Sequence, residues 1–439
     1  MSAARRSPLV LFLLHALYDG LFLLFLLFAA PWFALRALRD RGLRESLGGR
    51  FGAGPRRAGA RPCIWVHGVS VGEIKAARLL VTQLAAARPD HDLVVSSTTS
   101  AGFALAKRLF PEQLVVQFPL DLRWIVRRVL DRVRPDLIVL VELEIWPNLM
   151  AEAQRRSIPV VIVNGRVSAR SFKGYRLLSR LLPQFELIRR YAVQSEEYAE
   201  RLRALGVPDA QVEVTGNLKY DTLRTELPEA QLVATRALLG LAADAPLIVA
   251  GSTHAGEEEL FVQELAAWER AAPATRLLIA PRHVERVGEV VRTIERMGRQ
   301  AARLTEVRAR GAPPPAHAVL VADTIGELET FYALARVAFV GGSLVERGGH
   351  NMLEPAALGV ATLYGPSTEN FRAEVALLAE RGGGEVVAER GALAAAISRY
   401  LVDPAAARAQ GERGRAAVAA IRGGTARSLD VLLSLLSTG

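Results

Sequence analysis

Residues 63–97 read CIWVHGVSVGEIKAARLLVTQLAAARPDHDLVVSS and decide the fold class. An apolar run at 63–67 is followed by a glycine-rich turn, by an amphipathic stretch over Ile74–Ala86 and by a second apolar run at 92–97. Apolar strands separated by helices are typical of a parallel sheet that helices cover on both faces. The segment therefore predicts a β-α-β unit.

The same alternation continues along the chain. Further strand-like runs lie at 114–120, 136–144, 159–166, 190–195, 212–217, 246–253, 276–283, 318–324, 337–343, 361–366 and 385–389. The segment 221–245 has no strand pattern, so it predicts an interdomain linker. We expect an α/β fold of two Rossmann-like domains, 48–220 and 246–439, which face one another across a cleft.

The composition excludes several classes of protein. The chain has 439 residues, of which 51% are hydrophobic and 23% charged, so it is neither disordered nor collagen-like. Its single cysteine, Cys63, excludes an intrachain disulfide and a cysteine-based metal cluster. A reducing compartment is expected.

The N-terminal segment is apolar from Leu9 to Leu35, which is longer than the roughly 20 residues that span a bilayer. His15 and Asp19 interrupt it on one helical face. Arginines stand before and directly behind it, which favours a cytoplasmic position for the folded part. Residues 1–47 therefore predict a membrane anchor with a basic juxtamembrane segment. A cleaved signal peptide and a helix lying in the membrane interface are the alternatives.

The positive charge of the chain is concentrated beside this segment. Residues 1–61 contain ten arginines and three acids, a net +7 out of the total +10. A nucleic-acid-binding protein usually carries its basic surface on the folded domain. The pattern predicts an anionic membrane surface as a partner, and no nucleic acid.

Three polar groups follow strands of the first domain, where ligands of such sheets bind. Glu73 could act as a general base. Alternatively, it could form a capping box with Ser70 at the start of a helix. Glu142 and Glu144 end an apolar strand, where acids could have a catalytic role. Alternatively, one of the two carboxylates only pairs with an arginine to hold the turn. Lys219, one of four lysines, could neutralise a leaving phosphate, or else pair with Asp221.

The second domain has similar groups. The run 251–258, GSTHAGEE, is consistent with ordinary helix capping. Arg282 and His283 end a strand and suit a phosphate or a carboxylate. Glu327 could bind the ribose hydroxyls of a nucleotide, or else stabilise the start of a helix.

The segment 340–355, VGGSLVERGGHNMLEP, is the densest cluster of glycine and polar residues. Glycines let the backbone approach a ligand, and the helix that follows could offer its N–H groups to an anion. The segment matches neither a Walker A loop nor the dinucleotide-binding fingerprint. The chain shows no convincing spacing for a metal site and no G-x-S-x-G nucleophile motif.

These motifs resemble those of 3-deoxy-D-manno-octulosonic acid (Kdo) transferases, which add Kdo to the lipid A precursor. The resemblance is carried, in order, by HGVSVGE, VELEIWPN, NGRVSARSF, VTGNLKYD, GSTHAGEEE, APRHVER, DTIGELE, VGGSLVERGGHNMLEPAALG and YGPSTENF. It extends over nearly the whole chain, including the N-terminal anchor. Gly68, Leu143, Ile325 and Met352 stand where the family often has other residues, and none of these differences removes a charged group.

The resemblance implies an inverting GT-B glycosyltransferase that uses CMP-Kdo and no essential metal. Glu73 then corresponds to the catalytic base, and Glu142 and Lys219 correspond to the transition-state stabilisers. The CMP site corresponds to Pro281, Arg282, Ile325, Gly326, Glu327, Asn351, Met352, Leu353 and Glu354.

The expected function is transfer of Kdo from CMP-Kdo to the lipid A precursor (lipid IVA) in lipopolysaccharide biosynthesis. The expected place is the cytoplasmic side of the bacterial inner membrane. The alternatives are a membrane-associated GT-B transferase with a UDP-sugar donor and a catalytically silent, tethered nucleotide-binding protein. Binding of CMP against UDP, and a transfer assay, separate them.

Overall fold

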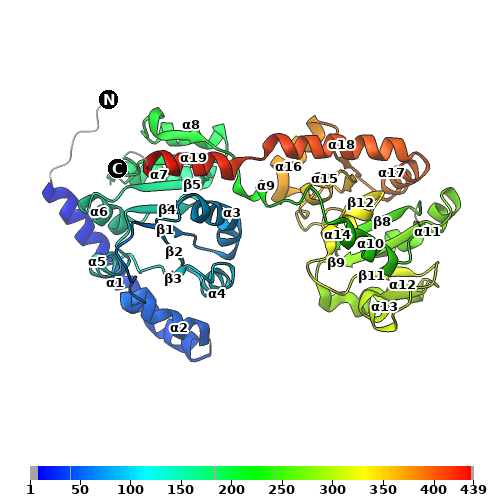
Figure 1. Cartoon of the computed structure of the whole chain (residues 1–439), viewed down its shortest axis with the longest axis horizontal. Coiled ribbons are helices and arrows are strands. Elements are labelled where there is room, and N and C mark those ends of the chain that lie inside the picture. The colour runs from blue at the N-terminus through cyan, green and yellow to red at the C-terminus, as the bar shows by residue number, and fades with distance from the viewer. Residues whose placement is uncertain (1–7, 40, 182–183, 243, 437–439) are drawn as a thin grey trace. The chain divides into compact units, whose positions relative to one another are not determined.

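The computed structural model describes residues 8–39, 41–181, 184–242 and 244–436. It contains two compact units (Figure 1): unit 1 is Met1–Thr222 with Arg422–Gly439, and unit 2 is Leu223–Ile421. Each unit is built around a seven-stranded sheet in which every pair of neighbouring strands is parallel. The predicted fold class, two Rossmann-like α/β domains, is confirmed.

The sheet of unit 1 has the strand order β3-β2-β1-β4-β5-β6-β7, so the order reverses between β1 and β4. In register, His67 of β1 lies opposite Ser96 and Leu140. Ligands of open parallel sheets bind at such a reversal, outside the carboxyl ends of the strands. The strands are β1 Cys63–His67, β2 Asp92–Ser97, β3 Leu114–Gln117, β4 Leu137–Val141, β5 Val160–Gly165, β6 Arg190–Val193 and β7 Val212–Val214.

Helices cover both faces of this sheet (Figure 1). Pro147 occupies the first turn of α6, where its missing N–H has no partner to lose. The helices are α1 Pro8–Arg39, α2 Arg41–Gly48, the π-helix η1 Gly49–Ala53, α3 Val71–Ala87, α4 Ser100–Leu109, α5 Arg123–Val133, α6 Pro147–Arg155, α7 Ala169–Leu181, α8 Glu196–Ala204, the 3₁₀ helix η2 Asp209–Gln211, α9 Leu218–Asp221 and α19 Gly424–Leu436.

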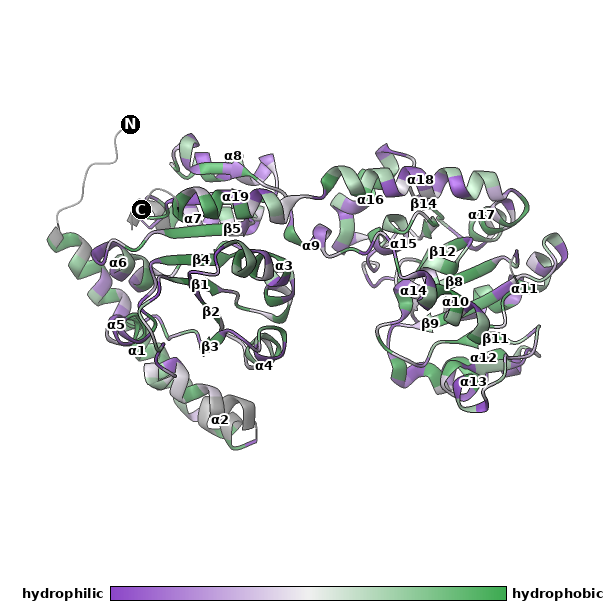
Figure 2. Cartoon of the chain, in the orientation of Figure 1, coloured by the Kyte–Doolittle hydropathy of each residue, from purple (hydrophilic) through white to green (hydrophobic). Residues whose placement is uncertain are grey.

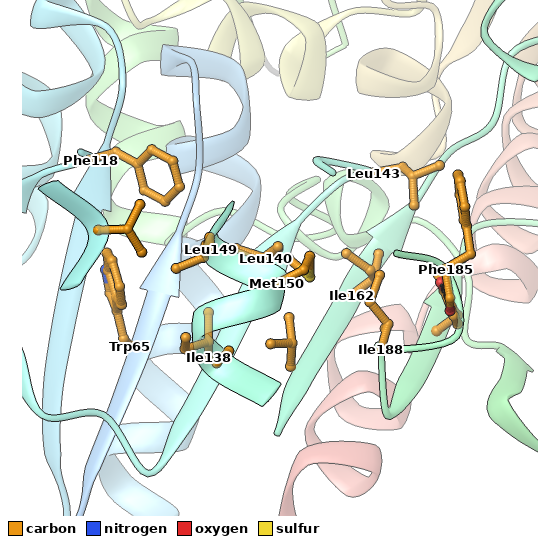
Figure 3. Packing of buried hydrophobic residues seen from close by; sticks show 14 of the residues in the cluster. Trp65, Phe118, Ile138, Leu140, Leu143, Leu149, Met150, Ile162, Phe185 and Ile188 are labelled. Atoms are coloured by element: carbon orange, nitrogen blue, oxygen red, sulfur yellow. Dashed lines mark hydrogen bonds between the residues drawn. The ribbon is translucent and has the colours of Figure 1, made fainter. Parts of the chain in front are cut away.

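The core of unit 1 has two layers because successive strand residues point to opposite faces of the sheet. Trp65 packs in one layer with Phe118 and Ile138, and Figure 3 shows this layer continuing along β4 and β5. Ile64 packs in the other layer with residues of α3 and α19. The strands read as unbroken apolar runs because both of their faces are buried.

The C-terminal segment corrects one predicted boundary. The sequence placed residues 246–439 in one domain, but Arg422–Gly439 belongs to unit 1. Val431 and Leu432 of α19 pack in the same layer as Ile64. The Asp221 carboxylate accepts hydrogen bonds from the amides of Gly423 at 2.6 Å and Thr425 at 2.5 Å. The segment therefore completes the core of unit 1.

The sheet of unit 2 has the order β10-β11-β9-β8-β12-β13-β14, with the reversal between β8 and β12. The edge strand β10 was not expected from the sequence, because it has only three residues and no apolar run. The strands are β8 Leu247–Thr253, β9 Arg276–Pro281, β10 Ala301–Arg303, β11 Val319–Val321, β12 Val337–Val340, β13 Ala361–Tyr364 and β14 Glu385–Val386.

The predicted linker 221–245 is also corrected. Residues from Leu223 onward belong to unit 2, where Gln231 donates a 2.7 Å hydrogen bond to Thr330 Oγ1, and Leu239 is fully buried. The helices of unit 2 are α10 Glu229–Leu238, α11 Glu258–Ala271, η3 Val284–Arg286, α12 Val287–Arg296, α13 Leu304–Arg310, α14 Leu328–Leu334, α15 Leu353–Ala357, η4 Glu369–Phe371, α16 Arg372–Glu380, α17 Arg390–Val402 and α18 Pro404–Ile421.

The N-terminal helix α1 is the one described helix that is long and apolar enough to cross a membrane, over Phe12–Pro31. Figure 2 shows the hydrophobic colour along it. Only 6% of that segment is buried inside the protein. The apolar N-terminal helix that the sequence predicted is therefore present, with most of its surface free to contact lipid.

Candidate active site

Glu73 lies in the first turn of α3, directly after β1, beside the reversal of strand order in unit 1. Its amide donates to Ser70 Oγ at 3.4 Å, and the Ser70 hydroxyl donates back to Glu73 Oε1 at 2.8 Å. The Val69 amide donates to Glu73 Oε2 at 2.6 Å. The Ser70 half of the capping box considered from the sequence is therefore formed, while the Glu73 carboxylate accepts from the Val69 amide, and these bonds fix the orientation of the carboxylate.

The environment of Glu73 changes its acidity. The residue is 9% exposed. Burial raises the pKa of Glu73 and the charge of Glu142 raises it further, whereas the hydrogen bonds from Ser70 and Val69 and the charge of Lys219 lower it. The net result is a raised pKa, which brings the carboxylate closer to the operating pH that suits a general base. Capping and proton transfer are thus compatible roles for one side chain.

Glu142 and Lys219 contact each other near Glu73. Glu142 follows β4 and has a left-handed backbone, with φ of 64°. Such a conformation in a non-glycine residue costs on the order of 1–3 kcal/mol and is common at functional sites. Lys219 Nζ lies 3.4 Å from Glu142 Oε1, so the ion pair of Lys219 is with Glu142 and not with Asp221, the alternative that the sequence offered. The three predicted catalytic residues form one electrostatic cluster within unit 1.

The position of Lys219 is set by the start of the short helix α9. The Asn217 side chain caps this helix and accepts a 3.0 Å hydrogen bond from the Lys219 amide. Asn164, which is fully buried near the end of β5, accepts a 3.0 Å hydrogen bond from the Leu218 amide. The backbone of Lys219 is therefore fixed to the sheet of unit 1 while its ammonium group stays half-exposed.

Glu144 is a third acid of this cluster, and the sequence assigned it no separate role. Burial raises its pKa to about 7, and the charges of Glu73 and Glu142 contribute in the same direction. Its spacing of two residues from Glu142 was the available signal. At neutral pH a carboxyl group with this pKa exchanges protons readily.

Unit 2 contains a pocket of about 300 Å³ after strands β9 and β11. Four of the residues predicted for the CMP site line it: Pro281, Arg282, Ile325 and Gly326. The Ile325 side chain is 88% exposed, which is unusual for an apolar residue and provides a surface for a flat ring. Gly326 has a φ of 90°, which favours glycine.

Glu327 does not line this pocket. Burial raises the pKa of Glu327, but hydrogen bonds from Arg308 and Thr324 lower it on balance. Both partners contact the carboxylate directly. The side chain therefore secures the turn before α14, as the alternative reading of the sequence proposed.

The segment Asn351–Glu354 precedes and begins α15. Met352 is fully buried and Leu353 is 1% exposed, so both side chains belong to the core of unit 2. Asn351 Nδ2 donates to Glu354 Oε1 at 3.2 Å. Burial raises the pKa of Glu354 to about 7, Glu329 adds to this effect, and the charge of Arg282 opposes it. The influence of Arg282 places Glu354 near the pocket, whereas Met352 and Leu353 could contribute only backbone groups.

Glu257 organises the glycine-rich loop that follows β12. Its carboxylate is fully buried and accepts hydrogen bonds from the amides of His254, Gly342, Ser343 and Leu344 at 2.8–3.1 Å. These four amides are therefore not available to a ligand, whereas none of them belongs to the helix that follows the loop. Sequence reasoning missed this role because Glu257 and the loop are about 85 residues apart.

A second cavity, of about 450 Å³, shares His283 with the first pocket. It is also lined by His254, Arg286 and Arg347. His254 Nε2 lies 2.9 Å from the corresponding nitrogen of His350. Burial lowers the pKa of His350 to about 4, with Arg282 and the other two histidines contributing. Two arginines and one acid, Glu346, line this cavity, so its net positive charge suits an anionic ligand.

Within the described part of the chain, no group of three or more His, Cys, Asp or Glu side chains has the geometry to hold a metal ion.

Known proteins resemble this chain in sequence. A profile of the family described as 3-Deoxy-D-manno-octulosonic-acid transferase (kdotransferase) matches residues 45–222. A 3-deoxy-D-manno-octulosonic acid transferase of Bordetella pertussis is 36% identical over 420 residues, covering 91% of this chain and 94% of the relative. The protein of the same name from Haemophilus influenzae is 33% identical over 372 residues, covering 84% and 86%.

A solved structure is similar over most of the chain. UDP-GlcNAc 2-epimerase from Neisseria meningitidis, bound to UDP-GlcNAc, matches with a TM-score of 0.55 and 14% identity, covering 86% of this chain and 100% of that one. At this identity the likeness shows the fold alone.

Proposed function

Because the chain belongs to the Kdo transferase family, we propose that it moves Kdo from CMP-Kdo to the lipid A precursor (lipid IVA), with inversion at the sugar. Membership of the family makes the protein a glycosyltransferase. The identities of the donor, CMP-Kdo, and of the acceptor are what we propose. The observation that carries it is the cluster of Glu73, Glu142 and Lys219 at the strand-order reversal of unit 1.

The proposed step needs one base and a stabilised leaving group. A hydroxyl oxygen of the acceptor attacks the anomeric carbon of Kdo, and its proton passes to the Glu73 carboxylate. The bond from that carbon to the phosphate oxygen breaks, and CMP leaves with the electron pair. Lys219 stabilises the growing negative charge, and Glu142 orients Lys219. Removing one such electrostatic interaction commonly lowers the rate by about 10²–10³.

We assign CMP to the pocket of unit 2. Arg282 provides a cation for the phosphate, and Ile325 provides an apolar surface for the base. Kdo is an acid, as its name states, so its carboxylate requires a further cationic group. The neighbouring cavity with Arg286 and Arg347 is the candidate for it.

We place the protein on the cytoplasmic side of the bacterial inner membrane. An acylated acceptor stays in the bilayer. An apolar helix such as α1 would hold the enzyme at the membrane surface, where that acceptor is found. The arginine excess around α1 fits an anionic membrane surface.

The test is a transfer assay with CMP-Kdo and a tetraacylated lipid A precursor, repeated with Glu73→Gln. We expect the wild-type chain to transfer Kdo and the variant to lose at least 10²-fold in rate. Titration calorimetry should show equal CMP affinity for both. The matched control is Glu112→Gln, a change at an exposed acid of the same unit, which should keep full activity.

Binding and transfer measurements on the same purified protein also distinguish the proposed function from its two alternatives. Tighter binding of UDP than of CMP would favour a UDP-sugar donor. Binding of CMP without any transfer would favour a silent tethered protein. We also expect transfer to continue in EDTA, since the proposed step uses charged side chains alone.

A further inference from the structure

The polar side of α1 is docked on the folded part of unit 1. His15 Nδ1 lies 3.2 Å from Asn148 Oδ1, and Asn148 Nδ2 donates to Asp19 Oδ1 at 2.6 Å. Asn148 lies in the first turn of α6 and is fully buried. Arg123 of α5 lies 3.9 Å from Asp19 and stacks over the Phe12 ring at 5.4 Å. The residues that interrupt the apolar segment are thus matched by partners on unit 1.

The chain after α1 returns to the same unit. The Leu120 amide donates a 3.0 Å hydrogen bond to the carbonyl of Arg50 in η1. Arg57, which is 7% exposed, donates to the carbonyl of Val133 and to the Asp92 carboxylate at 2.8 and 2.6 Å. The N-terminal part of the apolar segment and the chain that follows α2 are therefore both fixed to unit 1.

This double attachment is incompatible with a membrane crossing. A helix of about 20 residues is roughly 30 Å long, so a crossing would put its two ends on opposite sides of the hydrocarbon core. The eight residues of α2 are too few to cross back. Unit 1 could hold both the N-terminal part of a crossing helix and the chain behind α2 only by entering the bilayer, which Arg127 and Glu152 beside α1 oppose.

The outward side of α1 remains apolar. Leu13, Leu17, Leu21 and Phe28 are 56%, 59%, 59% and 77% exposed. Their spacing of mostly four residues places them along one side of a helix.

Next to α1, the outer face of α5 carries a tryptophan and several arginines, which are side chains that interact well with lipid headgroups. Trp124 is 53% exposed, and tryptophan is enriched at the membrane–water interface. Beside it, Arg56, Arg128 and Arg132 line a shallow hollow, and Arg127 belongs both to this hollow and to the cavity beneath α1. A guanidinium group binds phosphate well.

We propose that α1 does not cross the bilayer but lies within one leaflet, with its apolar side among the acyl chains and the arginines of α5 on the headgroups of anionic phospholipids. This inference rests on the membrane location given above and is independent of the transferred sugar. It assigns α1 and the outer face of α5 to one continuous lipid-binding surface.

Cysteine labelling tests the position of α1. The native Cys63 is fully buried, and burial raises its pKa to about 12, so the wild-type chain should react little with maleimides. Leu9→Cys and Leu38→Cys place a thiol at each exposed end of α1. In spheroplasts, we expect a membrane-impermeant maleimide to label neither variant until the cells are lysed. Labelling of only one end from outside would overturn the proposal. This readout does not depend on catalysis, so it can succeed or fail separately from the proposed function.

Vesicle binding tests the arginines of α5. With the full chain, Arg128→Gln combined with Arg132→Gln should weaken binding to phosphatidylcholine vesicles containing phosphatidylglycerol, by about fivefold for each arginine. The control combines Arg78→Gln and Arg292→Gln, which are exposed and remove the same charge elsewhere. Unchanged thermal unfolding would show that the variants are folded. Equal losses in the variant and the control would overturn the assignment of the surface to α5.

Discussion

The Asp221 carboxylate and the amide nitrogen of Gly423 lie 2.6 Å apart, although 202 residues separate them in the sequence. Asp221 lies just before the chain enters unit 2, and Gly423 lies just after it returns. One side chain thus joins the two places where the chain passes between the units. It also ends the short helix that carries Lys219.

Asp221→Asn should therefore impair catalysis through Lys219. The variant loses charge-assisted hydrogen bonds to Gly423 and Thr425, which stabilise the fold by about 1.5–3 kcal/mol. Urea unfolding measures that loss, and the transfer assay should show a lower kcat. In a Lys219→Ala background the same change should have little further effect on kcat. Additive losses would contradict the link. Asp209→Asn, which breaks an exposed ion pair with Arg203, is the control.

Substitutions of Lys219 and of Glu142 should shift the midpoint of the acid limb of the pH–rate profile in opposite directions. Glu73 accepts a proton only when it is ionised, so activity falls as the pH falls through its pKa. Lys219 lowers that pKa, so Lys219→Met should move the midpoint of the limb to higher pH. Glu142 raises it, so Glu142→Gln should move the midpoint to lower pH. The midpoint of log kcat/KM against pH is the readout. Lys107→Met, on α4, should leave it in place, and shifts of the same sign in both test variants would refute the assignment.

Arg282→Ala should weaken CMP binding. A charge-assisted hydrogen bond contributes about 1.5–3 kcal/mol, which corresponds to a loss of roughly 10- to 150-fold in affinity. Titration calorimetry with CMP measures this. Arg292→Ala, an exposed arginine on α12, should bind as the wild-type chain does. Equal affinity of the Arg282 variant would show that CMP binds elsewhere.

Glu257→Gln should destabilise unit 2 and weaken CMP-Kdo binding together. A glutamine offers one acceptor oxygen where the carboxylate accepts from four amides, and its NH₂ group would face donors. Each unsatisfied buried amide costs about 1–3 kcal/mol. Thermal unfolding and donor titration measure the two effects, with the exposed Glu295→Gln as the control. Wild-type stability in the Glu257 variant would mean that the loop does not depend on this residue.

Much of the fold could be predicted because the strands are buried on both faces and so stand out as apolar runs. The strand β10 could not, since Ala301–Arg303 has no such run. The membership of α19 in unit 1 could not either. The apolar residues of α19 could pack on the sheet of either unit. They pack with Ile64 of unit 1, and a contact between residues so far apart in the sequence cannot be read from the local pattern.

The site shows the same division. The capping box of Ser70 and Glu73 is local, and the sequence contained it as an alternative. The pairing of Lys219 with Glu142 and the binding of the loop amides by Glu257 are long-range, so spacing could not reveal them. Met352 and Leu353 matched a motif, but their burial in the core of unit 2 leaves only their backbone for a ligand.

The return of Arg422–Gly439 to unit 1 has a consequence for biosynthesis. Translation proceeds from the N-terminus, so all of unit 2 leaves the ribosome before α19 does. Until then the nascent unit 1 lacks Val431 and Leu432 and exposes the apolar layer around Ile64. A message truncated after codon 421 would yield a complete unit 2 joined to an unfinished partner that is prone to aggregate.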